Sequence, residues 1–260
     1  MSETTPNSLT FLGTTGAIPD SGNDSPCLII NRDMLIDTGW HSIHTMRTLG
    51  FDPLEIRYVV FTHFHHDHYM SLPSLLYYWM SRGEHLSQLT IAGPMEDLER
   101  IVGFALAFLE NEKGFSHKGQ PKLIPLRAGE SFHTERFHIH TCRTIHPVAG
   151  LCYRFEDRRS AEVFSYTGDT AYSEHIIDHV KGSSVLIHET AMGPHAADPG
   201  NNRYLHAGAV DAAKVALEAG VKTLYLIHTS IQRSEACVQA AKRIFGGQVI
   251  WPEVGNTVII

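Results

Sequence analysis

The chain has 260 residues, of which 43% are hydrophobic, and carries a formal net charge of −7 at pH 7. This length is ample for a sizeable core. The acidic balance argues against a surface that grips nucleic acid without sequence preference, because long polyanions are usually met by an excess of Lys and Arg. No linker, charge block or fixed-period repeat divides the sequence, so it predicts one domain over residues 1–260.

The N-terminal segment and the cysteines bear on location. Residues 1–6 contain neither a basic nor an apolar region, and no apolar run approaches the roughly 18 residues of a membrane span. These features predict a soluble cytoplasmic protein with no membrane contact. The cysteines are widely spaced and form no CxxC pair, which favours buried free thiols over a redox motif or a zinc knuckle. They are Cys27, Cys142, Cys152 and Cys237.

Apolar runs that end in polar residues recur along the chain. Runs of alternating or continuous apolar residues predict strands, and apolar residues at helical spacing predict helices. Several of the strands lead directly into histidine or acidic residues, and strand ends commonly carry functional sites. The predicted strands cover residues 57–61, 137–142, 163–166, 185–187, 223–227 and 257–260, and the predicted helices cover residues 71–81, 95–109 and 207–219.

A dense group of candidate metal ligands occupies residues 62–68, just beyond the first of these strands. On a loop at the edge of a sheet, His63 and His65 can turn toward one ion while Asp67 and His68 turn toward a neighbouring ion. Imidazole and carboxylate together suit Zn²⁺, with Mn²⁺ or Fe²⁺ as lesser options. The segment therefore predicts half of a two-metal hydrolase site.

This segment matches the HxHxDH signature of the metallo-β-lactamase superfamily, which the chain resembles over nearly its whole length. Within that superfamily it looks most like the ribonuclease Z group of phosphodiesterases. The resemblance implies an α+β fold, a four-layered αββα sandwich with the metals in a cleft at the sheet edges. The matching segments are Phe11-Leu12-Gly13-Thr14, Leu35-Ile36-Asp37-Thr38-Gly39, His188-Glu189-Thr190 and His206.

The resemblance also implies a ligand set and a nucleophile. Two zinc ions are the expected cofactors, and a water held between two cations is acidic enough to supply a metal-bridging hydroxide near neutral pH. Asp37 is expected behind the ligands, where a carboxylate fixes the tautomer of a ligating imidazole. The implied ligands are His63, His65 and His146 for one ion, Asp67, His68 and His228 for the other, and Asp169 as the bridge.

The leaving group needs a proton donor. In the ribonuclease Z group a histidine supported by a glutamate is assigned that task, and the matching residues here are His206 and Glu189. With Asp67 they form the candidate catalytic set. The context departs from the family, because Thr190 directly follows Glu189 where the family has Ala-Thr, and His206 precedes Ala-Gly where the family more often has Ser-Thr. A capping or structural role is the alternative for His206.

Other histidines lie outside any ligand spacing. We interpret these, including His175 and His179, as surface residues.

The spacing of the motifs bears on the substrate. Members that process tRNA carry a long basic arm, which in the smaller ones lies between the third and fourth metal motifs. Here only 22 residues separate His146 from Asp169, enough for a strand pair with a turn at residues 157–160. A longer insert runs from Tyr69 to Gln120, and its aromatic residues could stack on a nucleobase or form a helix core.

The sequence thus predicts a phosphodiesterase on a small anionic phosphodiester, with cyclic nucleotides among the candidates. Relatives with small substrates commonly build the active site from both subunits, so a homodimer is expected. Two alternatives stay open: a tRNA 3′-processing endonuclease, which the missing arm disfavours, and a non-catalytic metal-bound interaction module, which the complete ligand set disfavours. Lactone or β-lactam hydrolysis would not call for the pair of His206 and Glu189.

Overall fold

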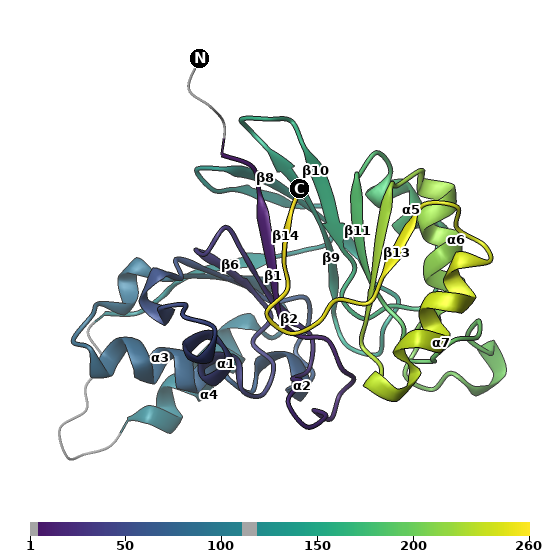
Figure 1. The fold of residues 1–260 in the computed structure, drawn as a ribbon. Coiled ribbons are helices and arrows are strands. Elements are labelled where there is room, and N and C mark those ends of the chain that lie inside the picture. The colour runs from purple at the N-terminus through teal and green to yellow at the C-terminus, as the bar shows by residue number, and fades with distance from the viewer. Residues whose placement is uncertain (1–4, 111–118) are drawn as a thin grey trace.

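The computed structural model of the chain describes residues 5–110 and 119–260. Two seven-stranded sheets pack face to face, and helices cover the outer face of each sheet (Figure 1). The four-layered αββα sandwich expected from the sequence is therefore confirmed.

The first sheet has the strand order β14-β1-β2-β3-β4-β5-β6. Its strands from β14 to β3 are antiparallel to their neighbours, and those from β3 to β6 are parallel. The late strand β14 pairs with β1, so segments far apart in the sequence share one sheet. The strands are β1 (Ser8–Gly13), β2 (Cys27–Ile30), β3 (Met34–Ile36), β4 (Tyr58–Val60), β5 (Thr90–Pro94), β6 (Lys122–Leu126) and β14 (Thr257–Ile259).

The second sheet repeats this plan, with the order β13-β12-β11-β10-β9-β8-β7. Its strands from β7 to β10 are antiparallel and those from β10 to β13 are parallel. Each sheet therefore has a parallel half. The strands are β7 (Ser131–His133), β8 (Phe137–Arg143), β9 (Leu151–Asp157), β10 (Val163–Tyr166), β11 (Val185–Glu189), β12 (Thr223–Ile227) and β13 (Gln248–Ile250).

The helices divide between the two outer faces. Those before β6 lie on the first sheet and those after β10 on the second (Figure 1). The α-helices are α1 (Ser42–Thr48), α2 (His66–Tyr69), α3 (Leu72–Ser81), α4 (Leu98–Leu109), α5 (Glu174–Val180), α6 (Ala209–Ala219) and α7 (Ile231–Lys242), and the short 3₁₀ helices are η1 (Pro53–Glu55), η2 (Leu86–Gln88) and η3 (Pro199–Asn201).

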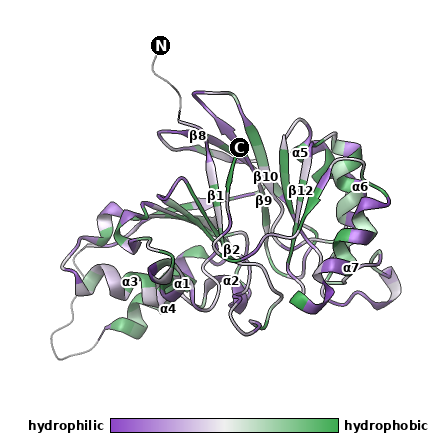
Figure 2. Cartoon of the chain, viewed as in Figure 1, coloured by the Kyte–Doolittle hydropathy of each residue, from purple (hydrophilic) through white to green (hydrophobic). Residues whose placement is uncertain are grey.

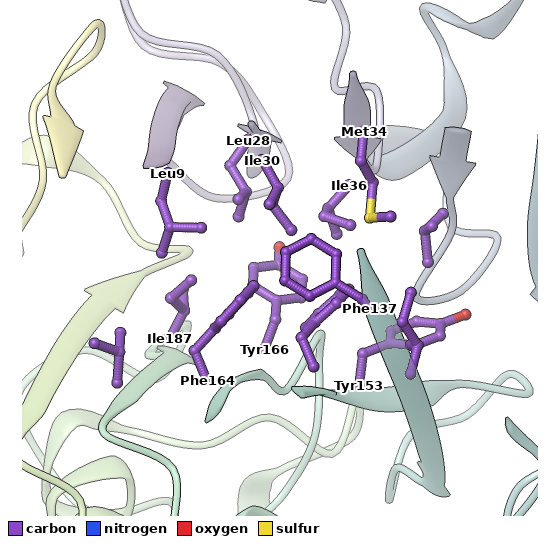
Figure 3. Packing of buried hydrophobic residues seen from close by; sticks show 14 of the residues in the cluster. Leu9, Leu28, Ile30, Met34, Ile36, Phe137, Tyr153, Phe164, Tyr166 and Ile187 are labelled. Atoms are coloured by element: carbon purple, nitrogen blue, oxygen red, sulfur yellow. The ribbon is translucent and has the colours of Figure 1, made fainter. Parts of the chain in front are cut away.

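Three apolar clusters hold the layers together. The central one fills the space between the sheets, where side chains of the first sheet such as Leu28 and Ile36 face Phe164 and Ile187 of the second (Figure 3). The other two lie between each sheet and its helices. The strands are accordingly apolar and the helices present polar faces to solvent (Figure 2). Burial on both faces explains why the strands read as continuous apolar runs.

The structure corrects several expectations in detail. Residues 62–68 are not entirely loop, because α2 begins at His66. The helix expected from residue 207 begins at Ala209, since Gly208 is its N-cap, where a Cβ atom would lie 1.8 Å from the carbonyl oxygen of His195. The helix expected from residue 95 begins at Leu98, after a turn.

The region from Tyr69 to Gln120 is also part of the sandwich rather than an insert, because it supplies α3, β5 and α4. Residues 111–118 of it lie outside the described residues. Its aromatic residues divide: Trp79 is fully buried, whereas Phe104 and Phe108 are 61% and 80% exposed. The core interpretation therefore holds for Trp79 and is wrong for the two phenylalanines.

The cysteines are free, as expected, with Cys142 half-buried and the other three buried. His175 is exposed, as expected. His179 was expected on the surface but is half-buried, and its Nε2 atom is shielded from solvent between α5 and the second sheet. No helix within residues 5–110 and 119–260 has the length and apolarity needed to cross a membrane.

The central core gives a stability prediction. Phe155 is fully buried, stacks on Phe164 at 4.7 Å between ring centroids and meets Phe137 edge-on. Phe155→Ala should lower the free energy of unfolding by about 3–5 kcal/mol, because it leaves a cavity. Ile18→Ala, at a site that is 80% exposed, should change it by no more than about 0.5 kcal/mol. Urea unfolding measures both, and equal small effects would contradict the packing described.

Candidate metal centre

The site lies where parallel strands from both sheets end. β3 and β4 run parallel in the first sheet, and β10, β11 and β12 run parallel in the second. The carboxyl ends of parallel strands meet at one edge, and this edge is where open α/β sheets bind ligands. The residues placed there are Asp37 after β3, His63 after β4, Asp169 after β10, Glu189 at the end of β11 and His228 after β12.

Hydrogen bonds join the two sheets beside this edge. The backbone N–H of Leu151 donates to the carbonyl of Thr62 at 2.8 Å, and the hydroxyl of Tyr153 donates to the carbonyl of Phe61 at 2.7 Å. His228 N–H donates across to the first half of the chain, to the carbonyl of Thr14 at 2.8 Å. The sheets are thus fixed relative to each other where the candidate ligands meet.

Three histidines form the first cluster. The ligand atoms of His63, His65 and His146 all lie within 4.8 Å of one another, and Nε2 of His146 is 2.9 Å from Nδ1 of His65. His146 comes from the loop between β8 and β9, and His65 from the turn that leads into α2. Ring nitrogens from separate parts of the chain therefore converge on one point.

The second cluster contains Asp67, His68, Asp169 and His228, again within 4.8 Å. Oδ2 of Asp169 lies 3.5 Å from Nε2 of His68 and 3.2 Å from Nε2 of His228. The same oxygen is 3.7 Å from Nε2 of His63, which belongs to the first cluster. Asp169 thus stands between the clusters, in the place expected of a bridging carboxylate.

The carboxylate of Asp37 sets the tautomers of two of these histidines. Its Oδ2 accepts a hydrogen bond from Nδ1 of His68 at 2.8 Å and another from the hydroxyl of Thr62 at 2.8 Å. Because that hydroxyl has used its hydrogen, it must accept from Nδ1 of His63, which lies 3.1 Å away. Nε2 therefore carries the lone pair in the neutral form of both His63 and His68.

Those lone pairs make the clusters suitable for cations. Within the described part of the chain, Nε2 of His63 and Nε2 of His68 are buried and have no hydrogen-bond partner. A buried polar atom without a partner costs about 1–3 kcal/mol, and the two nitrogens both face the Asp169 carboxylate. Divalent cations of borderline softness, such as Zn²⁺, would satisfy these nitrogen and oxygen atoms together. The residues present thus fit a pair of metal ions.

Protonation also favours cations. Burial lowers the pKa of His63 well below its ordinary value and that of His146 to about 4, so both rings are neutral at pH 7. Burial opposes ionisation of Asp67, but His68 and His228 hold the pKa of its carboxyl well below the usual range. Burial lowers the pKa of His68 and His228, but the carboxylates of Asp67 and Asp169 outweigh it and raise the pKa of both rings. A cation that binds these two rings therefore takes the place of their protons, whereas the neutral rings and the ionised carboxylates are already in the form that binds metal ions.

His206 and Glu189 lie against the second cluster. Nδ1 of His206 donates to Oε1 of Glu189 at 2.8 Å and lies 3.8 Å from Asp169. Burial lowers the pKa of His206, but the Glu189 carboxylate outweighs it and raises the pKa to about 9. Glu189 itself is buried and also accepts from the backbone N–H groups of Thr170 and Ala207. The histidine thus holds a proton beside the second cluster, with Nδ1 bound to Glu189.

The sequence did not point to two supporting residues. The hydroxyl of Thr62 donates to the Asp37 carboxylate and accepts from Nδ1 of His63, so it links these two residues. The Asn202 side chain accepts from the backbone N–H of His206 at 2.9 Å and donates to its carbonyl at 2.7 Å. The position of Thr62 directly before His63 could have indicated its supporting role. An asparagine four residues before His206 gives no such indication. His66 and His195 are exposed, and neither belongs to a cluster of ligand atoms among the described residues.

The connection between the third and fourth motifs is short. β9 ends at Asp157 and β10 begins at Val163. Asp157 closes the turn, because its Oδ1 accepts from the backbone N–H of Arg159 at 2.7 Å. These residues are all described, and they form a plain hairpin with no arm.

Comparison with known proteins agrees with this geometry. The model of the family "Anti-Pycsar protein Apyc1" matches residues 7–228. The chain is 28% identical over 251 residues to the probable metallo-hydrolase YhfI of Bacillus subtilis, and the match covers 93% of this chain and 95% of that protein. It is 24% identical over 294 residues to a ribonuclease Z of Methanothermobacter thermautotrophicus, with 91% and 92% covered.

Solved structures share the fold. The crystal structure of the metallo-β-lactamase fold protein YhfI from Bacillus subtilis superposes with a TM-score of 0.81 at 22% identity, covering 98% of this chain and 99% of that one. Human short-form tRNase Z gives a TM-score of 0.74 at 20% identity, with 97% and 99% covered. The predicted resemblance to the metallo-β-lactamase superfamily is confirmed.

The clusters predict how metal content responds to substitution. We expect two ions per chain, because seven nitrogen and oxygen ligands are too many for one tetrahedral ion. His68→Ala should lower the content to one ion or less, since it removes a ligand next to Asp169. His66→Ala, an exposed position in the same segment, should keep both ions. Elemental analysis measures the content, and equal loss in the two variants would contradict the assignment of His68.

Proposed function

Because the chain belongs to the anti-Pycsar Apyc1 family and is a metal-dependent hydrolase of the metallo-β-lactamase fold, we propose that it is a phosphodiesterase that hydrolyses cyclic nucleotides. The family degrades cyclic nucleotides. The observation that carries the proposal is the pair of His206 and Glu189 set directly against the clusters of candidate ligands. Opening a phosphodiester requires a proton for the departing oxygen, and this pair is built to provide one.

Metal binding in this proposal falls to the two clusters. His63, His65 and His146 would hold one ion, Asp67, His68 and His228 the other, with Asp169 shared. When bound, the ions would activate the attacking water and offset the charge that develops on the phosphate. Asp37 and Thr62 keep Nε2 of His63 and His68 free to face the ions.

The proton step follows from the histidine's own contacts. Nδ1 of His206 is held by Glu189, so the proton given to the leaving oxygen comes from Nε2. Glu189 fixes the orientation of the ring and stabilises its protonated form. Asn202 holds the backbone on either side of the same histidine, and Leu205 next to it has a positive φ of 55°. The donor is therefore kept in one position before substrate arrives.

The surroundings favour a small substrate. The hairpin from β9 to β10 offers no extended surface for tRNA, and the net charge of −7 disfavours a long polyanion. A cavity of about 310 Å³ opens beside His146 and is lined by Arg143 and Pro147, among others. That volume lies at the lower end of small-ligand sites. Arg143 could contact an anionic group there.

Zinc is the proposed metal, because imidazole and carboxylate ligands suit it. Residues 1–260 would act as one domain in the cytoplasm, since the clusters take ligands from both halves of the chain and all four cysteines are free. A homodimer is proposed because exposed aromatic residues, Phe104 and Phe108, lie on α4, and light scattering measures it directly.

Substrate preference is the first test. The metal-loaded protein should open cyclic nucleotides and cleave bis(p-nitrophenyl) phosphate, and it should show little activity on a tRNA precursor, because no arm grips the longer substrate. Rates on the three substrates measured side by side decide this. An Asp169→Ala variant, which removes the shared carboxylate, serves as the inactive control. Cleavage of the precursor at its 3′ trailer far above the rate on cyclic nucleotides would favour a ribonuclease Z activity instead.

The role of His206 is the second test. His206→Ala should lower the rate on a cyclic nucleotide, which has a poor leaving group, by about 10²–10⁴ while keeping the metal content, which is the usual contribution of a positioned general acid. The loss on bis(p-nitrophenyl) phosphate should be smaller, because p-nitrophenolate leaves without a proton.

Replacement of the nearby exposed His195 by Ala is the matched control and should change neither rate. Equal losses on both substrates in His206→Ala, or loss of metal, would remove this histidine from the acid role.

A further inference from the structure

Two cysteines that do not form a CxxC pair in the sequence become neighbours in the second sheet. Cys142 on β8 and Cys152 on β9 are directly opposite each other in the antiparallel register. Directly paired residues on adjacent strands project from the same face, and both thiols pack on the outer face of the sheet against α5. The thiols therefore stand side by side under that helix.

A histidine from α5 completes a group of three. A ring nitrogen of His179 and the two sulfur atoms all lie within 4.8 Å of one another. Among the described residues, Nε2 of His179 is buried without a hydrogen-bond partner. The backbone of His140 lies near the same ring and acts on it as a hydrogen-bond acceptor. The imidazole therefore has a buried, unpartnered nitrogen and lies beside two thiols.

An acceptor beside the ring together with a buried, unpartnered nitrogen is typical of metal-binding histidines. A ligating imidazole nearly always donates its other ring N–H to a carbonyl or carboxylate, which fixes its tautomer and direction. Burial and then the charge of Arg154 lower the pKa of His179 to about 4, so the ring is neutral at pH 7. An imidazole held in this way without a ligand would leave a buried acceptor unsatisfied.

We propose that Cys142, Cys152 and His179 form a second metal site, separate from the hydrolase centre, that binds one thiophilic d¹⁰ cation such as Zn²⁺. Two thiolates and a neutral imidazole balance the charge of a divalent ion, so the loaded site is neutral overall. Neutrality matters because the site borders an apolar cluster that includes Ile176 and Val180. On binding, each thiol loses one proton to solvent and forms one sulfur–metal bond.

The site would brace the strands that carry a hydrolase ligand. β8 and β9 flank the loop that holds His146, and Cys142 lies four residues before that histidine. An ion joining β8, β9 and α5 would restrict the movement of this strand pair. The inference does not depend on the substrate of the hydrolase centre.

Cobalt substitution tests the proposal on the whole chain. The hydrolase clusters offer only nitrogen and oxygen atoms, so a near-ultraviolet thiolate-to-cobalt charge-transfer band can come only from a cysteine site. The full-length protein is produced in cobalt-supplemented medium and kept reduced. We expect the band and a third cobalt ion per chain. Cys142→Ser and, separately, His179→Ala should lose the third ion, and with it the band, and keep the other two ions.

Cys237→Ser is the matched control, because Cys237 is buried in the same apolar cluster but lies outside the group of three. It should keep the band and the third ion. Absence of the band in the unmodified protein, or a band that survives Cys142→Ser, would overturn the proposal. So would a mass lower by two hydrogen atoms in protein prepared without reductant, with no band after reduction, which would identify the pair as a disulfide.

Discussion

The gathering of carboxylates and imidazoles away from water is the constraint on which the rest of this structure depends. Among the described residues, one ring nitrogen in each of His63, His68, His146 and His228 is buried without a hydrogen-bond partner. Several ring nitrogens also face one another or a shared carboxylate oxygen. Such an arrangement is unfavourable without cations and favourable with them. The parallel halves of both sheets end at this point. Hydrogen bonds beside it fix the two sheets to each other.

Holding ligands at strand ends also requires unusual backbone geometry. Asp37 and His228 have positive φ angles of 50° and 68°, a region that residues other than glycine seldom adopt. Each such residue costs of the order of 1–3 kcal/mol and persists only where its surroundings determine it. Here the contacts of Asp37 with Thr62 and His68 and the bond from His228 N–H to Thr14 supply that determination. At these two residues, strained backbone therefore coincides with the candidate metal centre.

The fold and the grouping of the candidate ligands were expected from a resemblance to a known superfamily, and the motifs that carry this resemblance are local signals. The HxHxDH segment, the apolar runs and the polar residues at their ends can all be read within a few positions. Sequence reasoning failed where contacts join distant segments. Cys142 and Cys152 show no CxxC spacing, and only the register of β8 and β9 makes them neighbours. His179 was assigned to the surface because nothing in its own segment shows what α5 covers. Asn202 was missed for a different reason, because it contacts only the backbone of His206, four residues away, and no pair of side chains signals this contact.

The pairing of β1 with β14 has a consequence for how the chain reaches this state. Ser8 to Thr10 pair with residues 257–259, so one side of β1 has no partner until those residues have been synthesised. An open strand edge is a template for pairing with other chains, and contacts across such a separation form slowly. On the ribosome the nascent protein would therefore present an unprotected edge for most of translation.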